Sequence, residues 1–177
     1  MAFGAAFVFV IMMFNVPMPG GTTGHAVGGT LVAILVGPWA AAIAITVALA
    51  VQAFLFGDGG VLALGANSFN MAFVLPFVGY YSYKLIGFKS AKGSVRRALA
   101  GATGAFLGIT AAAFLTAVEL GIQPVLYHAE NEQPLYCPYG LGIAIPAMLS
   151  EHILLFSWVE AVVTFLVIRC LQREGSL

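Results

Sequence analysis

The chain has 177 residues, is 61% hydrophobic and 8% charged, and has a mean hydropathy of +1.00. A soluble domain carries roughly 25% charged residues, so this composition excludes a water-covered surface and indicates a multi-span membrane protein. Residues 1–57, 59–83 and 98–118 contain no Asp, Glu, Lys or Arg, and a membrane helix needs about 20 mostly apolar residues. The net charge is zero, and the few basic residues form no surface for nucleic acid.

The apolar runs predict six membrane segments within an all-α bundle, which we treat as a single integral membrane domain over residues 1–177. Proline lacks an N–H donor and restricts the residue before it, so Pro17 and Pro19 should end the first segment and Pro124 the fifth. The glycines around Asp58 should end the third. The predicted segments are 1–16, 25–36, 39–56, 67–86, 96–121 and 140–170.

The second segment is too short to cross a membrane. Twelve residues of helix reach about 18 Å, whereas the apolar core of a bilayer is about 30 Å thick. Because irregular backbone at membrane depth needs protein or water partners, we expect a short helix shielded by its neighbours. Gly28 and Gly29 at its start would allow close packing.

Basic residues predict the orientation. Loops rich in Lys and Arg stay in the cytoplasm, so the region Lys84–Arg97 and the C-terminus should be cytoplasmic. Counting segments from there places the loop around His25 outside the cell, together with the loop 122–139. The basic residues that carry this argument are Lys84, Lys89, Lys92, Arg96, Arg97, Arg169 and Arg173.

His25 is the one Asp, Glu, Lys, Arg or His among the first 57 residues, and it follows a polar, glycine-rich stretch. Imidazole is the commonest metal-ligating side chain, so His25 is a candidate ligand in a pocket that opens to the outside. The alternative is a hydrogen-bonded loop histidine that caps the short helix. A metal needs the neutral imidazole, so binding should weaken below about pH 6.

Three polar residues follow the third segment and are candidates for support of this pocket. Asn67 and Asn70 are three residues apart and would share a helix face. Their amides could cap free N–H groups or steady a neighbouring loop. Asp58 lies between glycines and is most simply a turn former.

Glu160 lies deep in the sixth segment, where a charged side chain is costly and usually faces the bundle interior. His152 precedes it by eight residues, within about 80° on a helical wheel. Either side chain could support the site or form an internal polar lock.

The sequence carries no enzyme signature that we recognise. Glu151-His152 lacks the second histidine of a zinc-protease helix, and no Gly-x-x-x-x-Gly-Lys phosphate loop is present. Cys137 and Cys170 stand roughly 50 Å apart if the segment between them is helical, so they should not pair.

Segment five carries small residues at every fourth position, which lets helices approach closely. The stripe is suited to internal packing or, alternatively, to docking of a partner subunit. It consists of Ala100, Gly104, Gly108 and Ala112.

Several runs in order resemble the cobalt/nickel substrate-capture subunits of energy-coupling-factor transporters, the CbiM/NikM family. They are NVPMPGGTTGHAVGG (15–29), GPWA (37–40), GDGG (57–60) and LGANSFNM (64–71), with weaker likeness at 78–80 and 159–164. The resemblance implies a prokaryotic inner-membrane subunit that captures Ni²⁺ or Co²⁺, the latter for cobalamin synthesis, with no tightly bound cofactor. Its partners would be the lipid bilayer, a transmembrane coupling subunit, cytoplasmic ATPases that hydrolyse ATP, and a small accessory membrane subunit.

In that family the metal is held by nitrogen atoms: the N-terminal amine, the amide and imidazole of a histidine at position two, and a second imidazole, which His25 matches. An all-nitrogen planar set suits Ni²⁺ and accepts Co²⁺. Asn67 and Asn70 match the loop packed around that site. Position two here is Ala2, so we expect a sequence that lacks the family's Met-His start and first helix. The alternatives are a degenerate scaffold subunit that binds no metal, or a capture subunit for an organic micronutrient.

Overall fold

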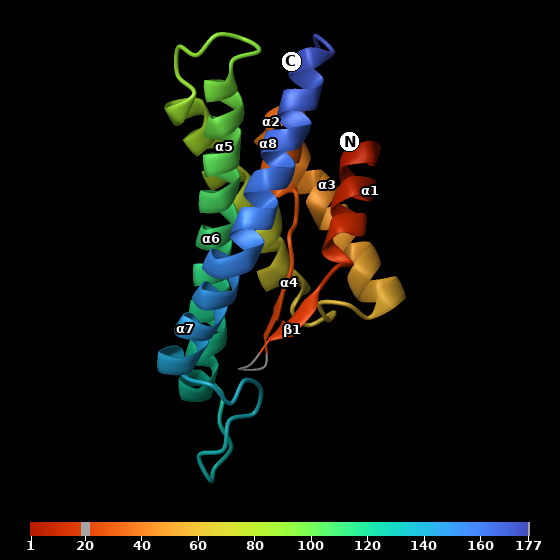
Figure 1. The fold of residues 1–177 in the computed structure, drawn as a ribbon. Helices are drawn as coiled ribbons and strands as arrows, with labels where there is room; N and C mark the ends of the chain where they lie inside the picture. The colour runs from red at the N-terminus through yellow and green to blue at the C-terminus, as the bar shows by residue number, and fades with distance from the viewer. Residues whose placement is uncertain (19–21, 177) are drawn as a thin grey trace.

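The computed structural model describes residues 1–18 and 22–176, and its regular structure is almost entirely helical (Figure 1). The all-α prediction is therefore confirmed. Three segments, labelled η, are π-helices that continue directly from α-helices. The elements in chain order are α1 (Ala2–Met12), β1 (Val16–Met18), β2 (Thr22–Gly24), α2 (Gly29–Val36), α3 (Pro38–Val51), η1 (Gln52–Phe56), α4 (Leu64–Asn67), η2 (Ser68–Val74), α5 (Leu75–Ile86), α6 (Val95–Leu126), α7 (Leu141–Glu151), η3 (His152–Phe156) and α8 (Ser157–Arg173).

Three continuous helical rods in the described part of the chain are long and apolar enough to cross a membrane. They span Pro38–Phe56, Val95–Leu126 and Leu141–Arg173, with 19, 32 and 33 residues. Each rod contains an apolar stretch of 18 residues with at most two Asp, Glu, Lys or Arg residues. These rods agree with the predicted third, fifth and sixth segments and support a polytopic membrane protein.

The predicted short second segment is also present. Helix α2 has eight residues, and its first five, from Gly29 to Ala33, are buried. It packs against α3, α5 and α6. Neighbouring helices thus enclose this short helix, as predicted from its length.

Two predicted boundaries were wrong. Helix α6 runs through Pro124 to Leu126, because a proline in the last turn removes one hydrogen bond and leaves little helix to break. Helix α1 ends at Met12, and Val16–Met18 forms an antiparallel pair with Thr22–Gly24. Pro17 is tolerated there because a two-stranded ribbon consists of edge strands. Pro19, predicted to help end the first segment, lies outside the described residues.

The small-residue stripe of α6 serves internal packing against α5. A Cβ atom at Gly104 would lie 2.5 Å from the carbonyl oxygen of Gly79, and one at Gly108 would lie 2.6 Å from that of Leu75. Ala100 and Ala112 on the same face are buried as well. The internal-packing alternative is therefore confirmed.

The two basic regions lie at the same end of the bundle, opposite the loop between α6 and α7 (Figure 1). Nη1 of Arg169 donates to the carbonyl oxygen of Gly93 at 3.0 Å, and Nε2 of Gln172 donates to that of Ser94 at 3.3 Å. The C-terminal end of α8 is thereby joined to the basic loop. Both cysteines, Cys137 and Cys170, are free, as expected.

Replacing Gly108 with alanine should destabilise the bundle, because the new methyl group would press on the backbone of α5. Overpacking of this kind costs about 1–3 kcal/mol, so the thermal midpoint in detergent should fall. Gly142→Ala in α7 is the matched control, since nothing lies within 4 Å of its Cβ position. Equal midpoints for the two variants would contradict the close α5–α6 contact.

Candidate metal-capture site

A cavity of about 350 Å³ lies between the helices, and four of the predicted site residues line it. His25 enters from the segment between β2 and α2, and Asp58 from the loop after η1. Asn67 belongs to the end of α4, and His152 to the start of η3. The rest of the described wall is mainly apolar and includes Met12, Leu49, Met71, Leu75, Ile109 and Met148.

His25 presents one free ring nitrogen to this cavity. Its Nδ1 lies 3.2 Å from the carbonyl oxygen of Ala26, so Nδ1 is assigned as the donor and Nε2 keeps its lone pair. Burial lowers the pKa of His25, because desolvation disfavours the charged ring; the Ala26 carbonyl and Asp58 act in the opposite direction. Burial thus favours the neutral ring, which is the form that binds metal ions.

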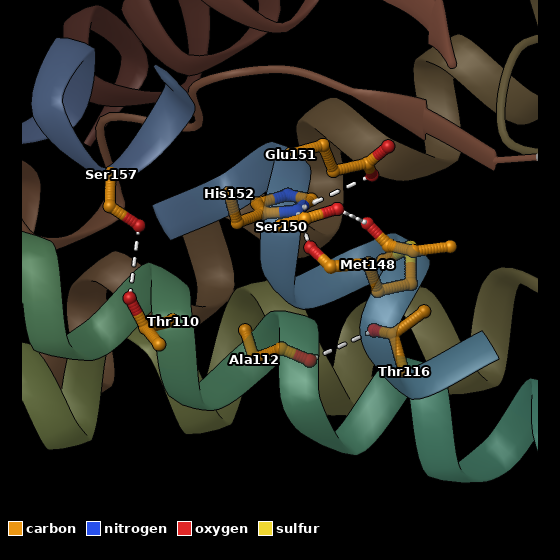
Figure 2. Close-up of polar contacts among 9 residues, drawn as sticks. Thr110, Ala112, Thr116, Met148, Ser150, Glu151, His152 and Ser157 are labelled. Carbon is orange, nitrogen blue, oxygen red and sulfur yellow. Dashed lines mark hydrogen bonds and ion pairs between the residues drawn. The ribbon is translucent and has the colours of Figure 1, made fainter. Parts of the chain in front are cut away.

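His152 is arranged in the same way. Its Nδ1 donates to the carbonyl oxygen of Met148 at 2.8 Å and lies 3.4 Å from Oε1 of Glu151 (Figure 2). Its Nε2 is left as the nitrogen with a free lone pair. Two imidazoles therefore line one cavity, and both are fixed through Nδ1 by a backbone carbonyl.

The π-helices shape this cavity. Each of the three supplies one wall residue: Gln52 from η1, Met71 from η2 and His152 from η3. A π-turn holds one residue more than an α-turn and is frequent at functional sites. The additional residue in η3 makes the eight residues from His152 to Glu160 equivalent to about seven residues of α-helix. The angle between the two side chains around the helix axis is therefore about 20° and not the predicted value of about 80°. Both side chains consequently point into the bundle.

Glu160 does not line the cavity; it contacts the segment that carries His25. Its Oε2 accepts hydrogen bonds from the backbone N–H groups of Val27 and Gly28, both at 2.9 Å. The side chain is 1% exposed. Gly28 has a φ of +74° at the N-terminal end of α2, a conformation that glycine adopts without strain.

Asn67 holds the loop that contains Asp58. Its Nδ2 donates to the carbonyl oxygen of Gly59 at 3.0 Å. Gly57, with a φ of +69°, ends η1 and turns the chain into this loop. Asp58 follows directly, within the turn that the glycines form.

Asn70 faces a different partner from Asn67. It is 1% exposed, and its Nδ2 donates to Oε2 of Glu119 on α6 at 2.6 Å. Glu119 was not predicted as a site residue, although it is the first charged residue after the charge-free run 98–118. Gln52 and Thr116 in the cavity wall were not predicted either, because neither belongs to a recognisable motif.

The described residues contain no group of three or more His, Cys, Asp or Glu side chains placed to hold a metal ion. His25 and His152 are the imidazole side chains that line the cavity in this part of the chain. His128 lies elsewhere, in the exposed loop after α6.

The fold and the cavity together define a polytopic, all-α membrane protein with imidazoles in an internal cavity. The family model described as "CbiM: Cobalt uptake substrate-specific transmembrane region" matches residues 1–176. The chain belongs to this family.

Relatives from bacteria support the assignment. The chain is 56% identical over 169 residues to the probable fused nickel transport protein LarMN of Lactiplantibacillus plantarum, covering 96% of this chain and 50% of that protein. It is 49% identical over 171 residues to the fused nickel transport protein NikMN of Rhodobacter capsulatus, covering 97% and 49%. The chain thus spans about half the length of these curated relatives.

Two further comparisons agree. The cobalt transport protein CbiM of Acetoanaerobium sticklandii is 30% identical over 171 residues, with 97% of this chain and 67% of that protein covered. The crystal structure of a truncated transition metal transporter superposes with a TM-score of 0.92 at 57% identity, covering 98% of this chain and 79% of that one. These relatives are named as transport proteins, in agreement with the prediction of a transporter subunit.

Changing Asn70 to Asp should destabilise the contact between η2 and α6, because Glu119 would lose its N–H donor and face a second carboxyl group. Loss of a hydrogen bond to a charged group costs about 1.5–3 kcal/mol, which should lower the thermal midpoint. Adding Glu119→Gln returns an amide donor and should restore the midpoint. A double variant no more stable than Asn70→Asp alone would contradict this pairing.

Proposed function

We propose that this chain is the substrate-binding membrane subunit of an ATP-driven energy-coupling-factor importer for Ni²⁺ or Co²⁺. The observation that carries the proposal is His25, whose neutral imidazole lines an internal cavity with Nε2 free. Imidazole nitrogen suits both ions. His25 is the metal donor, while Asp58, Asn67, Asn70, His152 and Glu160 support the cavity and its loops.

The partners follow from the same proposal. A transmembrane coupling subunit and cytoplasmic ATPases would drive release of the ion to the inside, since no phosphate-binding loop occurs in the sequence. The fused names of the nickel relatives favour a transporter of several components. The basic end of the bundle would face the cytoplasm and the His25 segment the outside.

The alternative of an organic micronutrient is less well supported. The cavity wall combines two imidazoles with aliphatic and thioether side chains, a chemistry that suits an ion better than a flat ring, which aromatic side chains would stack upon. A scaffold subunit that binds no metal is the remaining alternative. It predicts co-purification with the coupling subunit but no metal affinity.

The proposal is tested by Ni²⁺ calorimetry on the purified chain in detergent. His25→Ala should weaken binding at least about tenfold, equivalent to about 1.4 kcal/mol, because it removes a donor nitrogen. His128→Ala, in the exposed loop, is the matched control and should bind like the parent.

His25→Ala that binds Ni²⁺ as tightly as the parent would refute the assignment of His25. A parent chain that binds no Ni²⁺ yet co-purifies with a coupling subunit would support the scaffold alternative instead.

A further inference from the structure

We propose that Glu160 is a positioning residue for His25, and that α8 with the end of η3 holds the His25 segment on both sides of the imidazole. The inference rests on the proposed function of His25 as a metal donor. Glu160 itself would touch no metal; it would act by fixing the backbone from which the imidazole extends.

On the C-terminal side of His25, hydrogen bonds attach the segment to α8. Oε2 of Glu160 accepts the N–H groups of Val27 and Gly28, both at 2.9 Å. These two donors directly precede Gly29, the first residue of α2, and Gly28 is the N-cap of that helix. A carboxyl group at a helix N-terminus makes strong hydrogen bonds, so the backbone two residues after His25 is fixed to α8.

On the N-terminal side of His25, the segment packs against Phe156 at the end of η3. Any Cβ atom on Gly24 would collide with the ring of Phe156, so this ring lies directly on the backbone of the residue before His25. Phe156 is 5% exposed. It precedes Glu160 by four residues, the spacing that brings side chains to one helix face.

The two contacts leave His25 little freedom besides rotation of its own side chain, and Nδ1 is already engaged with Ala26. A binding residue must be held within about 0.5 Å of its productive position. The position of Nε2 is therefore set by α8, a helix that follows His25 by more than a hundred residues in the sequence.

The first experiment needs no metal. Diethylpyrocarbonate modifies free imidazole nitrogens. Mass spectrometry measures the extent of modification at His25, with the exposed His128 as an internal reference. Glu160→Ala should raise the reactivity of His25 several-fold and speed deuterium exchange at the amides of Val27 and Gly28, because both lose their acceptor.

The matched control is Thr164→Val, one turn further along α8. Thr164 is buried, and its hydroxyl has no hydrogen-bond partner among the described residues, so this variant should behave like the parent. If Glu160→Ala does not fold, Phe156→Leu tests the other contact and should also raise the reactivity of His25. Unchanged reactivity and exchange in the variants that fold would overturn the proposal.

The second experiment is Ni²⁺ calorimetry. Glu160→Ala should weaken binding about 10–100-fold, the usual effect of removing a group that orients a ligand. Glu160→Gln should restore most of the affinity, because its amide oxygen still accepts N–H groups. Faster exchange with unchanged affinity would make Glu160 a structural lock and overturn its positioning role. If the parent binds no Ni²⁺, the proposed function fails, and the metal-free experiment still decides whether Glu160 holds His25.

Discussion

Helix α2 begins inside the bundle, where its leading N–H groups need acceptors that water does not supply. One carboxyl oxygen of Glu160 accepts the N–H groups of Val27 and of the N-cap residue Gly28, where the chain enters this helix. Without that acceptor, a helix of eight residues would expose unsatisfied donors to an apolar interior. The segment from β2 to α2 can therefore keep its place only while α8 lies beside it.

Close packing on the other side of α2 completes this arrangement. Thr30 of α2 packs directly against Gly79 of α5, so a Cβ atom at Gly79 would collide with the Thr30 side chain. Gly104 and Gly108 bring α6 onto the backbone of α5. The absent side chains let α2, α5 and α6 converge, while the larger residues around Leu75 and Ile109 border the cavity. Small residues thus determine where the helices meet and where a space remains.

Much of this arrangement could be predicted from the sequence. Apolar runs located the long rods, and the short run before Gly37 predicted an enclosed helix. The pairing of Val16–Met18 with Thr22–Gly24 escaped prediction because it depends on contacts between two short segments, not on an apolar pattern. Of the site residues, His25, Asp58, Asn67 and His152 were expected and line one cavity. The contact of Glu119 with Asn70 joins residues 49 apart, and no local spacing rule reaches that far.

The π-helix η3 also changes how sequence spacing should be read along the last rod. Seven residues make close to two α-helical turns, so a histidine and a glutamate seven apart on an unbroken α-helix would face the same way. Here the two residues are eight apart and still do so, since the π-turn His152–Phe156 takes up the additional residue. A protein with one residue fewer in this stretch and an unbroken α-helix would place its imidazole and its carboxyl group in the same positions as His152 and Glu160. Two such sequences would align only with a gap, although their three-dimensional arrangement would be the same.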